Sequence, residues 1–442
     1  MPRRRIRLNA VQTLSLGFAA MILAGGVLLS LPLAARSGQA MPFLDALFTS
    51  ASASCVTGLS LYDTYTQFSF FGQLVLMLLI QIGGLGFMSV STVVAVLLHR
   101  RIGLRHRSIL MDSVGALQVG GIVRLTQRAL RITLVCEGGG AVLLALWFVP
   151  RYGWARGLWM GLFHAVSSYC NAGFDLLGTG SSLSMMAGDV LPNVVLMALV
   201  IAGGLGFLVW DDILTHGRHF ARWRLHSKIV VCGTSALFIL GAAGFYILEG
   251  GHAFAGAPAS QKLLMACFQS VTCRTAGFAT ADLMKLSQSG VLLTMILMFV
   301  GAGSGSTGGG AKVNTVAVIV LCAMAQIGRK DDVNVFRRRL DEETIHRAYS
   351  SVSLFFLACL CGSMVLCLQG VSLDGALFES ISAMGTVGLT LGVTPALPAF
   401  SKAAVIVMMF TGRVGSMSVA MAMTRNKPQP KLRSVPEKIL IG

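Results

Sequence analysis

Charged residues are scarce in this sequence, and acidic residues are the scarcest. Only 12% of the 442 residues are Asp, Glu, Lys or Arg, whereas 55% are hydrophobic. Soluble domains carry about 25% charged residues, so a water-soluble fold is excluded. The apolar residues instead recur in stretches of about 20, the length that an α-helix needs to cross a bilayer. The sequence therefore predicts a polytopic membrane protein.

The chain also lacks the groupings of residues on which catalysis and metal binding depend. Its ten Cys include no C-x-x-C pair, and its eight His form no H-E-x-x-H or similar ligand spacing. We find no acid paired with a base and no nucleophile beside one, so an enzyme is not expected. A polytopic membrane enzyme, the alternative from another class, needs a cluster of His, Asp or Glu at one membrane face.

Eight apolar stretches are predicted to span the membrane. They cover residues 11–33, 70–98, 132–149, 190–213, 228–248, 291–326, 350–368 and 399–424. The predicted fold class is therefore all-α, with eight spanning helices.

The basic residues lie mostly on one side of these spans. Of the 35 Lys and Arg, 26 fall on the side of the amino terminus, seven fall opposite and two fall inside the membrane. This is the positive-inside pattern, which predicts that both termini are cytoplasmic. It also accounts for the net charge of +17 without nucleic acid as a partner. A signal peptide at the basic start is disfavoured, because cleavage would delete the first helix of the repeat described next.

Four short apolar stretches, too short to span, repeat one phrase that ends in a Gly-centred turn. They read ALFTSASASCVTGL at 46–59, GLFHAVSSYCNAGF at 161–174, ACFQSVTCRTAGF at 266–278 and ALFESISAMGTVGL at 376–389. The turn glycines Gly58, Gly173, Gly277 and Gly388 are 115, 104 and 111 residues apart. The chain is thus predicted to consist of four helix, re-entrant loop, helix repeats. Their predicted bounds are 1–107, 108–223, 224–340 with an intramembrane gate loop at 301–312, and 341–442 with a cytoplasmic tail.

Such turns predict a pore. Non-helical backbone at membrane depth is tolerated only where it is buried in protein or lines water. Four equivalent turns around one pseudo-fourfold axis would surround it with carbonyl oxygens that replace the hydration shell of a cation. Each short helix also directs the negative end of its dipole at its turn. A carrier with inverted repeats is the alternative, but two spans in each repeat give parallel repeats instead.

The segment 301–312 contains six glycines within ten residues and should break its helix. We interpret it as a loop beneath the pore; the alternative is a structural kink packed against a neighbour. Its glycines resemble nucleotide-binding motifs, but no strand precedes them and Val313 replaces the Ser or Thr that holds Mg²⁺. No nucleotide is expected to bind this chain.

The four turns, ending in Val-Thr-Gly, Asn-Ala-Gly, Thr-Ala-Gly and Thr-Val-Gly, resemble the selectivity-filter loops of the Trk/Ktr/HKT superfamily of K⁺ transporters. Further phrases are similar to it: GGLGF at 83–87 and 203–207, GSTGGGAK at 305–312 and GRVG at 412–415. The length and the carboxyl end resemble the KtrB type. Cys55, Cys170 and Ser416 depart from common family residues, which puts no filter carbonyl in doubt.

This resemblance implies a pore in a bacterial cytoplasmic membrane that passes K⁺, and allows Na⁺, through filter backbone carbonyls alone. It also implies a homodimer in the lipid bilayer, regulated by a cytosolic nucleotide-binding subunit of the KtrA or TrkA type. The filter residues would be Val56, Thr57, Gly58, Asn171, Ala172, Gly173, Thr275, Ala276, Gly277, Thr386, Val387 and Gly388. The gate would comprise Gly303, Ser304, Gly305, Ser306, Thr307, Gly308, Gly309, Gly310, Lys312 and Arg413.

The remaining charged residues receive weaker predictions. Arg413 lies within the last span and is expected to face the pore or a partner, with an ion pair to Glu137 as the alternative. The resemblance implies that it contacts the gate loop. We expect five residues to set the field of the outer mouth: Arg274, Asp45, Asp63, Asp175 and Asp282. Glu137, Asp211 and Asp212 are predicted to be solvated or paired near cytoplasmic helix ends, and His164 to be a packing residue.

Overall fold

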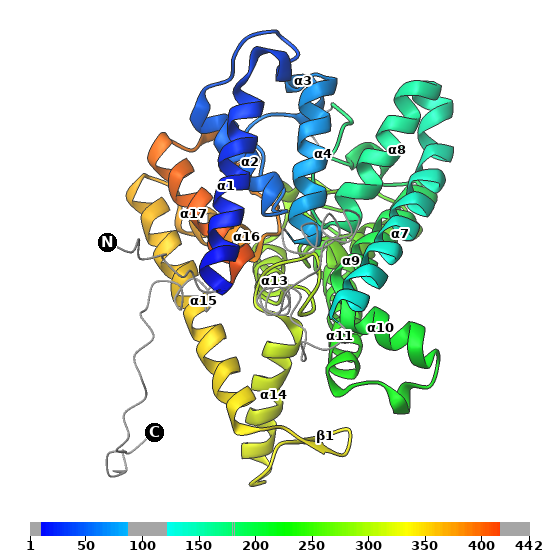
Figure 1. Cartoon of the computed structure of the whole chain (residues 1–442), viewed down its shortest axis with the longest axis vertical. Helices are drawn as coiled ribbons and strands as arrows, with labels where there is room; N and C mark the ends of the chain where they lie inside the picture. The colour runs from blue at the N-terminus through cyan, green and yellow to red at the C-terminus, as the bar shows by residue number, and fades with distance from the viewer. Residues whose placement is uncertain (1–9, 87–121, 179, 181, 416–442) are drawn as a thin grey trace, which may run out of the picture.

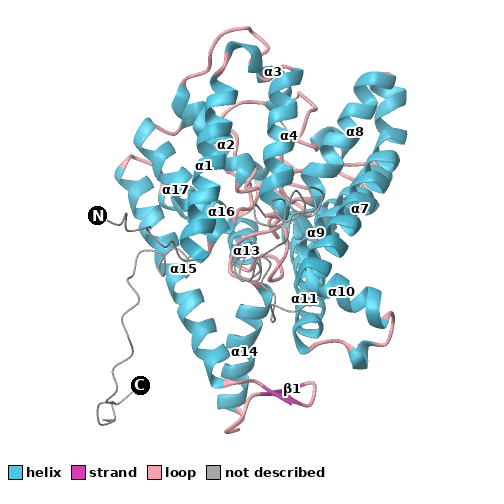
Figure 2. Cartoon of the chain, viewed as in Figure 1, coloured by secondary structure: helices cyan, strands magenta, loops and turns pink. Residues whose placement is uncertain are grey.

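The computed structural model describes residues 10–86, 122–178, 180 and 182–415. Within these residues the protein is mostly helical, and one short hairpin, β1 (Asn334–Val335) with β2 (Arg338–Arg339), is the strand structure. Figure 1 shows long helices around a central region, and Figure 2 shows that many loop segments converge there. The predicted all-α fold class is confirmed.

The helices fall into four groups, which we call repeats 1 to 4. Each group has a long first helix, a short pore helix and a shorter second helix. Repeat 1 has α1 (Ala10–Ser30), α2 (Phe43–Ser54), α3 (Thr64–Gln67) and α4 (Phe70–Leu85); repeat 2 has α7 (Ile122–Tyr152), α8 (Trp154–Tyr169), α9 (Val190–Leu205) and α10 (Phe207–His216). Repeat 3 has α11 (Leu225–Glu249), α12 (Ala259–Thr272), α13 (Gln288–Phe299) and α14 (Val313–Ile327); repeat 4 has α15 (Glu342–Leu368), α16 (Leu373–Gly385) and α17 (Ala399–Val414).

Short 3₁₀ turns complete the described chain. They are η1 (Pro32–Ala34), η2 (Ser184–Met186), η3 (Phe220–Arg222), η4 (Leu283–Lys285) and η5 (Thr394–Ala396). The predicted repeat boundaries stay predictions, and the first of them, at residue 107, lies outside the described residues.

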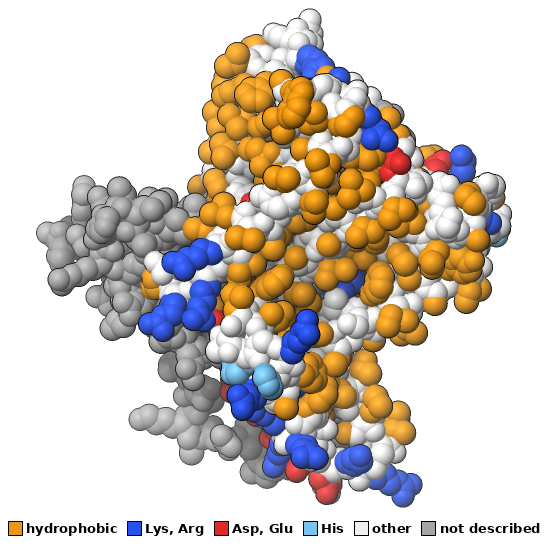
Figure 3. Space-filling model, turned by 90° about the vertical axis from the view of Figure 1, so that its right-hand side faces the viewer, with side chains coloured by type: hydrophobic (Ala, Val, Ile, Leu, Met, Phe, Trp, Pro, Cys, Tyr) orange, Lys and Arg blue, Asp and Glu red, His pale blue; other side chains and the backbone are white. Residues whose placement is uncertain are grey.

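The first helix of each repeat is long and apolar enough to cross a membrane. Among the described residues four unbroken helices meet this criterion, and they belong to α1, α7, α11 and α15. Their outward faces carry large apolar side chains, such as Ile247 on α11, which is 76% exposed. Figure 3 shows many hydrophobic side chains across the visible side of the molecule, with Lys and Arg most numerous in its lower part and a few near the top. Such a surface is suited to lipid rather than water.

The second helix of repeat 2 is broken where the sequence predicted a continuous span. In repeat 2, α9 and α10 meet at Gly206 with a bend of 95°, so the predicted span 190–213 is a broken helix rather than a continuous one. Gly206 has φ +93°, and a Cβ there would lie 2.7 Å from the Ser304 carbonyl oxygen, so only glycine fits. The break predicted within 291–326 is present between α13 and α14. The described parts of spans 70–98 and 399–424 end at Gly86 and Gly415, both with positive φ.

The four repeats close into a ring. The second helix of each repeat packs against the pore helix of the next one: α4 against α8, α9 against α12, α13 against α16, and α17 against α2. At the closing contact, Lys402 of α17 forms a 2.7 Å ion pair with Asp45 of α2, which also accepts a 2.7 Å hydrogen bond from Tyr62. This hydrogen bond raises the pKa of the Tyr62 hydroxyl to about 12.

Candidate functional site

The four Gly-centred turns meet around one axis. A Cβ built on each glycine would strike the carbonyl oxygen that precedes the glycine of the next repeat. The distances are 2.7 Å from Gly58 to Ala172, 2.7 Å from Gly173 to Ala276 and 2.5 Å from Gly277 to Val387, and the contact from Gly388 to Thr57 is closer still. The ring therefore runs in chain order and closes from the fourth repeat to the first. Each turn needs glycine, because a neighbouring backbone occupies the space of a side chain.

The backbone of the four turns follows one unusual pattern. The glycines have φ between +70° and +94°, and the residue two places before each glycine also has positive φ. These residues are Val56 (+52°), Asn171 (+59°), Thr275 (+72°) and Thr386 (+50°). Three of the four are β-branched, for which this conformation is a strained exception. Repetition of the same strain at four equivalent places indicates that the geometry of the turns is functional.

Ser and Thr residues of the pore helices accept hydrogen bonds from the N–H groups of the turns. Ser52 Oγ accepts a 3.1 Å hydrogen bond from Gly58 N, and Ser382 Oγ accepts an equivalent bond from Gly388 N at 3.1 Å. The N–H groups of Thr57, Ala172, Ala276 and Val387 donate to carbonyl oxygens of Ser52, Ser167, Thr272 and Ser382 at 2.7–3.0 Å. Sequence reasoning missed these anchoring residues, although a hydroxyl residue five or six places before each glycine was the available signal.

The carbonyl oxygens of the turns are left without donors. Within the described residues, no hydrogen bond reaches the carbonyl oxygen of any of the twelve predicted filter residues. Buried carbonyl groups are almost always paired, so twelve unpaired ones at one place require another partner. Four pore helices also direct the negative ends of their dipoles here. The arrangement is chemically suited to a desolvated cation held by main-chain oxygens.

The Gly-rich segment between α13 and α14 lies directly against these turns. The Cα of Gly308 faces Thr275 Oγ1 and that of Gly309 faces Thr386 Oγ1, so closely that a Cβ on either glycine would clash with the hydroxyl. Thr307 Oγ1 donates a 3.1 Å hydrogen bond to the Tyr169 carbonyl oxygen at the end of pore helix α8. The segment therefore reaches the turns of repeats 2, 3 and 4.

Backbone bonds tie the same segment to the broken helix of repeat 2. Gly303 N donates to the Gly204 carbonyl oxygen at 2.9 Å, and Phe207 N donates to the Gly305 carbonyl oxygen at 2.9 Å. The chain break at Gly206 thus frees N–H and carbonyl groups that pair with the segment. Contact with a neighbouring helix is also what the alternative, a structural kink packed against a neighbour, predicts.

Two basic residues hold the segment from other directions. Arg413, in the last turn of α17, donates to the carbonyl oxygens of Thr307, Gly83 and Gly84, the last at 3.0 Å. Lys312 Nζ donates to the Gly308 carbonyl oxygen at 2.5 Å and to that of Gly309 at 3.3 Å. Arg413 therefore bridges repeats 1 and 3 from repeat 4, and its predicted contact with the gate loop is present.

The alternative ion pair between Arg413 and Glu137 is wrong. Glu137 is 5% exposed, and its carboxylate accepts hydrogen bonds from Gln81 Nε2 at 3.1 Å and from Cys170 Sγ at 3.7 Å. Its predicted place near a cytoplasmic helix end is also wrong, because Cys170 directly precedes the second turn. Asp211, by contrast, is paired as predicted, with Arg128 at 2.6 Å and Arg224 at 3.0 Å.

Two further groups near helix ends behave as predicted. Asp212 is fully buried, 3.6 Å from Arg224 Nε, and accepts a 2.6 Å hydrogen bond from Ser227. His164 is also a buried packing residue, with Nδ1 2.7 Å from the Met160 carbonyl oxygen and its ring 5.0 Å from Phe148.

The five residues predicted at the outer mouth are divided by the structure. Arg274 lies behind the third turn instead, 8% exposed, and donates to the Thr234 hydroxyl at 3.2 Å. The carboxylate of Asp45 is paired with Lys402. Asp63 caps α3 and Asp282 caps η4, so both accept backbone hydrogen bonds. Asp175, two residues after Gly173, accepts a 3.1 Å bond from Leu177 N.

The described residues contain no group of three or more His, Cys, Asp or Glu that could hold a metal ion. The fold and this site together define a class: a membrane protein of four helix, pore helix, helix repeats, with a ring of unpaired carbonyl oxygens on its axis.

Comparisons with known proteins assign the chain within this class. Residues 9–435 match the family model TrkH, described as a cation transport protein. The potassium/sodium uptake protein NtpJ of Enterococcus hirae is 39% identical over 100% of this chain and 99% of its own length. The Ktr system potassium uptake protein B of Bacillus subtilis is 36% identical over 99% of this chain and 98% of its own.

A solved structure has the same fold. The potassium transporter TrkH of Vibrio parahaemolyticus superposes with a TM-score of 0.77 at 16% identity, covering 96% of this chain and 86% of that one. The chain belongs to the TrkH cation transport family, within the Trk/Ktr superfamily, and is close to KtrB.

Proposed function

We propose that the chain is the pore subunit of a K⁺ uptake system. The observation that carries this proposal is the ring of four strained turns whose carbonyl oxygens have no hydrogen-bond donor among the described residues. Relatives that share more than a third of the sequence are named as potassium or potassium/sodium uptake proteins. K⁺, with Na⁺ as a second permeant ion, is then coordinated by the backbone of residues 56–58, 171–173, 275–277 and 386–388. The chain acts as a transporter rather than as an enzyme.

Transport needs no energy source within the chain. A K⁺ ion enters the filter, exchanges its water for carbonyl oxygens and moves inward under the membrane potential, which supplies about 2.3 kcal/mol per charge for each 100 mV. Segment 301–312 then acts as a gate, because it lies against Thr275 and Thr386 at the end of the filter. Arg413 and Lys312 hold it there by charge-assisted hydrogen bonds to its carbonyl oxygens.

The surroundings of the pore subunit are part of the proposal. The distribution of basic residues supports cytoplasmic termini in a bacterial inner membrane. Two relatives are named as proteins of a Ktr system, which supports a partner subunit. We propose that this partner is a cytosolic nucleotide-binding protein of the KtrA or TrkA type and that the chain is a homodimer.

The test is Rb⁺ uptake by a K⁺-uptake-deficient bacterium at low external K⁺. Gly58→Ser, Gly173→Ser, Gly277→Ser and Gly388→Ser should each abolish growth and uptake, because each side chain would enter the space of a neighbouring carbonyl. Gly251→Ser is the matched control, since a Cβ at Gly251 meets nothing within 4 Å. Growth and uptake of all four filter variants at the wild-type level would refute the filter.

A further inference from the structure

The residue that directly precedes the left-handed position differs in charge among the four turns. In repeats 1, 2 and 4 this residue is Cys55, Cys170 or Gly385, and each is neutral and buried. In repeat 3 it is Arg274, which is 92% buried. The pseudo-fourfold ring of backbone thus carries one charged side chain, which belongs to the third repeat.

Arg274 has few partners for a buried guanidinium. Nη2 donates to the Thr234 hydroxyl at 3.2 Å and Nη1 donates to the Thr234 carbonyl oxygen at 3.4 Å, both on α11. Nε has no hydrogen-bond partner, and Arg274 takes part in no ion pair among the described residues. A charge inside a membrane protein without an acidic partner marks a functional residue by default.

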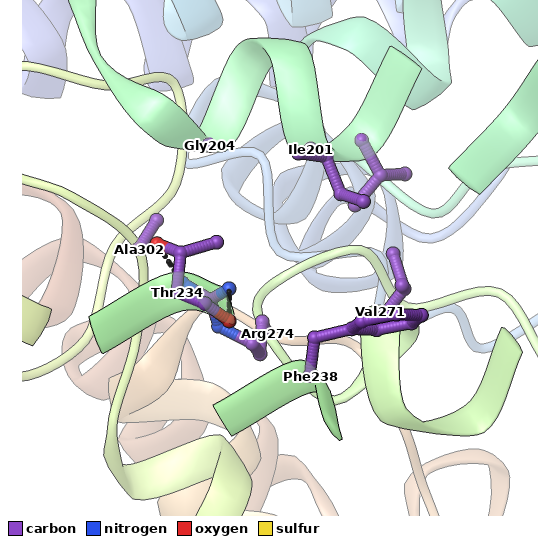
Figure 4. Close-up of a pocket in the computed structure, with 8 residues that line it drawn as sticks. Ile201, Gly204, Thr234, Phe238, Val271, Arg274 and Ala302 are labelled. Carbon is purple, nitrogen blue, oxygen red and sulfur yellow. Dashed lines mark hydrogen bonds between the residues drawn. The ribbon is translucent and has the colours of Figure 1, made fainter. Parts of the chain in front are cut away.

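Arg274 lines a cavity behind the third turn, among α9, α11 and α12, which Ala302 of the gate segment also lines. The cavity has a volume of about 20 Å³, and its lining includes Thr234, Phe238 and Val271 beside Gly204 and Ala302. Figure 4 shows Arg274 turned toward Thr234, with Ala302 of the gate segment on the same side. The space is about that of one water molecule, so it admits no further protein side chain that could neutralise the charge.

The end of pore helix α12 supplies negative partial charge beside Arg274. Arg274 follows the end of α12, whose terminal carbonyl groups form the negative end of the helix dipole. The dipoles of α2, α8 and α16 end on neutral residues and keep their attraction for a cation on the axis. At α12 the guanidinium offsets that attraction.

We propose that Arg274 is a specificity-determining residue that weakens cation binding at the inner end of the filter. Conduction requires that an ion bind well enough to enter and weakly enough to leave. A fixed positive charge behind one of the four turns weakens cation binding, so that the ion can leave, without altering the ring of carbonyl oxygens. This inference rests on the proposed function in K⁺ uptake.

Replacing Arg274 by the residue of repeats 1 and 2 tests the inference. Arg274→Cys should lower the half-saturating Rb⁺ concentration of uptake about fivefold, since one helix dipole then acts unopposed. The free energy of a divalent ion in the same field changes twice as much, so the Ba²⁺ concentration that half-inhibits uptake should fall by about the square of that factor, roughly 25-fold. Arg274→Gln is the second neutral variant and should shift both values in the same direction.

Two controls separate charge from structure. Arg274→Lys keeps the charge, so its half-saturating Rb⁺ concentration and its half-inhibiting Ba²⁺ concentration should stay within about twofold of wild type. Thr234→Val removes the hydroxyl partner but keeps the charge, and it should also leave both constants within about twofold. Rates are normalised to the amount of monodisperse protein purified from the same membranes.

The possible results are distinct. A lower maximal rate with an unchanged or higher half-saturating Rb⁺ concentration in both neutral variants means that Arg274 is structural, and overturns the inference. Equal shifts for Rb⁺ and Ba²⁺ overturn it as well, because an electrostatic effect must scale with ion charge. If wild-type protein takes up no Rb⁺ above cells without it, the proposed function fails instead.

Discussion

The filter turns and the gate segment differ in how many repeats build them. All four repeats supply a turn, and the turns share backbone angles, anchoring hydroxyl residues and a contact from each glycine to the next repeat. The gate segment comes from repeat 3 alone, and hydrogen bonds from repeats 2 and 4 and within repeat 3 hold it. Turns that coordinate an ion from all sides are built most simply from four equivalent repeats. A segment that has to clear the path of the ion is better supplied by one repeat, on one side of the pore.

The two regions are also held together differently. The turns are fixed by N–H groups that donate to their own pore helices, so each turn is stable within its own repeat. The gate segment is fixed by backbone hydrogen bonds to the break between α9 and α10 and, in addition, by charge-assisted bonds from the side chains of Arg413 and Lys312. Side chains change rotamer more readily than a backbone changes its path, so these side-chain bonds are the part of its anchoring that is suited to release.

The largest expected effect is a loss of uptake from alanine at the filter glycines, with a rank order set by local geometry. Gly388→Ala should reduce Rb⁺ uptake most, at least about 100-fold, because its Cβ meets the Thr57 carbonyl oxygen and its φ of +93° strains any other residue by roughly 3 kcal/mol. Gly173→Ala should reduce it least, because φ +70° is near the left-handed region that alanine tolerates. Uptake rates at matched expression give the order.

Symmetry of the ring makes this order informative. If Gly173→Ala is the most damaging of the four, local clash and backbone angle do not control the filter, and the four turns are not equivalent. Gly251→Ala serves as the unstrained control, as above.

A smaller effect, of opposite sign, is expected where Arg413 holds the gate. Arg413→Ala removes the bonds to the carbonyl oxygens of Thr307, Gly83 and Gly84. Hydrogen bonds to charged groups contribute about 1.5–3 kcal/mol, so basal Rb⁺ flux should rise at least about tenfold. Flux into proteoliposomes measures it, and Arg413→Lys should fall between the two. Unchanged or lower flux in correctly folded Arg413→Ala protein would count against a gate.

Much of the geometry of the turns could be predicted from sequence because its rules are local. One phrase repeated four times indicates four equivalent turns, and a glycine in each phrase indicates a backbone angle that other residues avoid. The helices α2, α8, α12 and α16 all end where the phrase predicts. What the phrase does not show is which side chains are buried behind the turn and which face the outer solution. Arg274 was placed at the outer mouth for that reason, because the phrase does not tell in which direction a side chain at the helix end points.

The broken helix of repeat 2 shows a second limit. Gly203, Gly204 and Gly206 were visible in the sequence, but paired glycines also occur in continuous membrane helices, where they allow close packing. The break at Gly206 depends on the gate segment, whose Ser304 and Gly305 carbonyl oxygens approach it. Those residues lie about a hundred positions away, so the interaction that breaks α9 from α10 is not local. The same holds for Glu137, whose partners Gln81 and Cys170 come from two other helices.

The smallest expected effect tests whether the gate segment is held at the filter end by single neutral contacts as well as by Arg413. Thr307→Val keeps the shape of a buried side chain and removes the hydrogen bond to the Tyr169 carbonyl oxygen. A neutral hydrogen bond contributes about 1 kcal/mol, so basal flux should rise about fivefold, less than for Arg413→Ala. Thr411→Val is the control, because among the described residues the Thr411 hydroxyl bonds only within its own helix, to Val407. A fall in flux for Thr307→Val would mean that Thr307 supports the filter rather than restrains the gate.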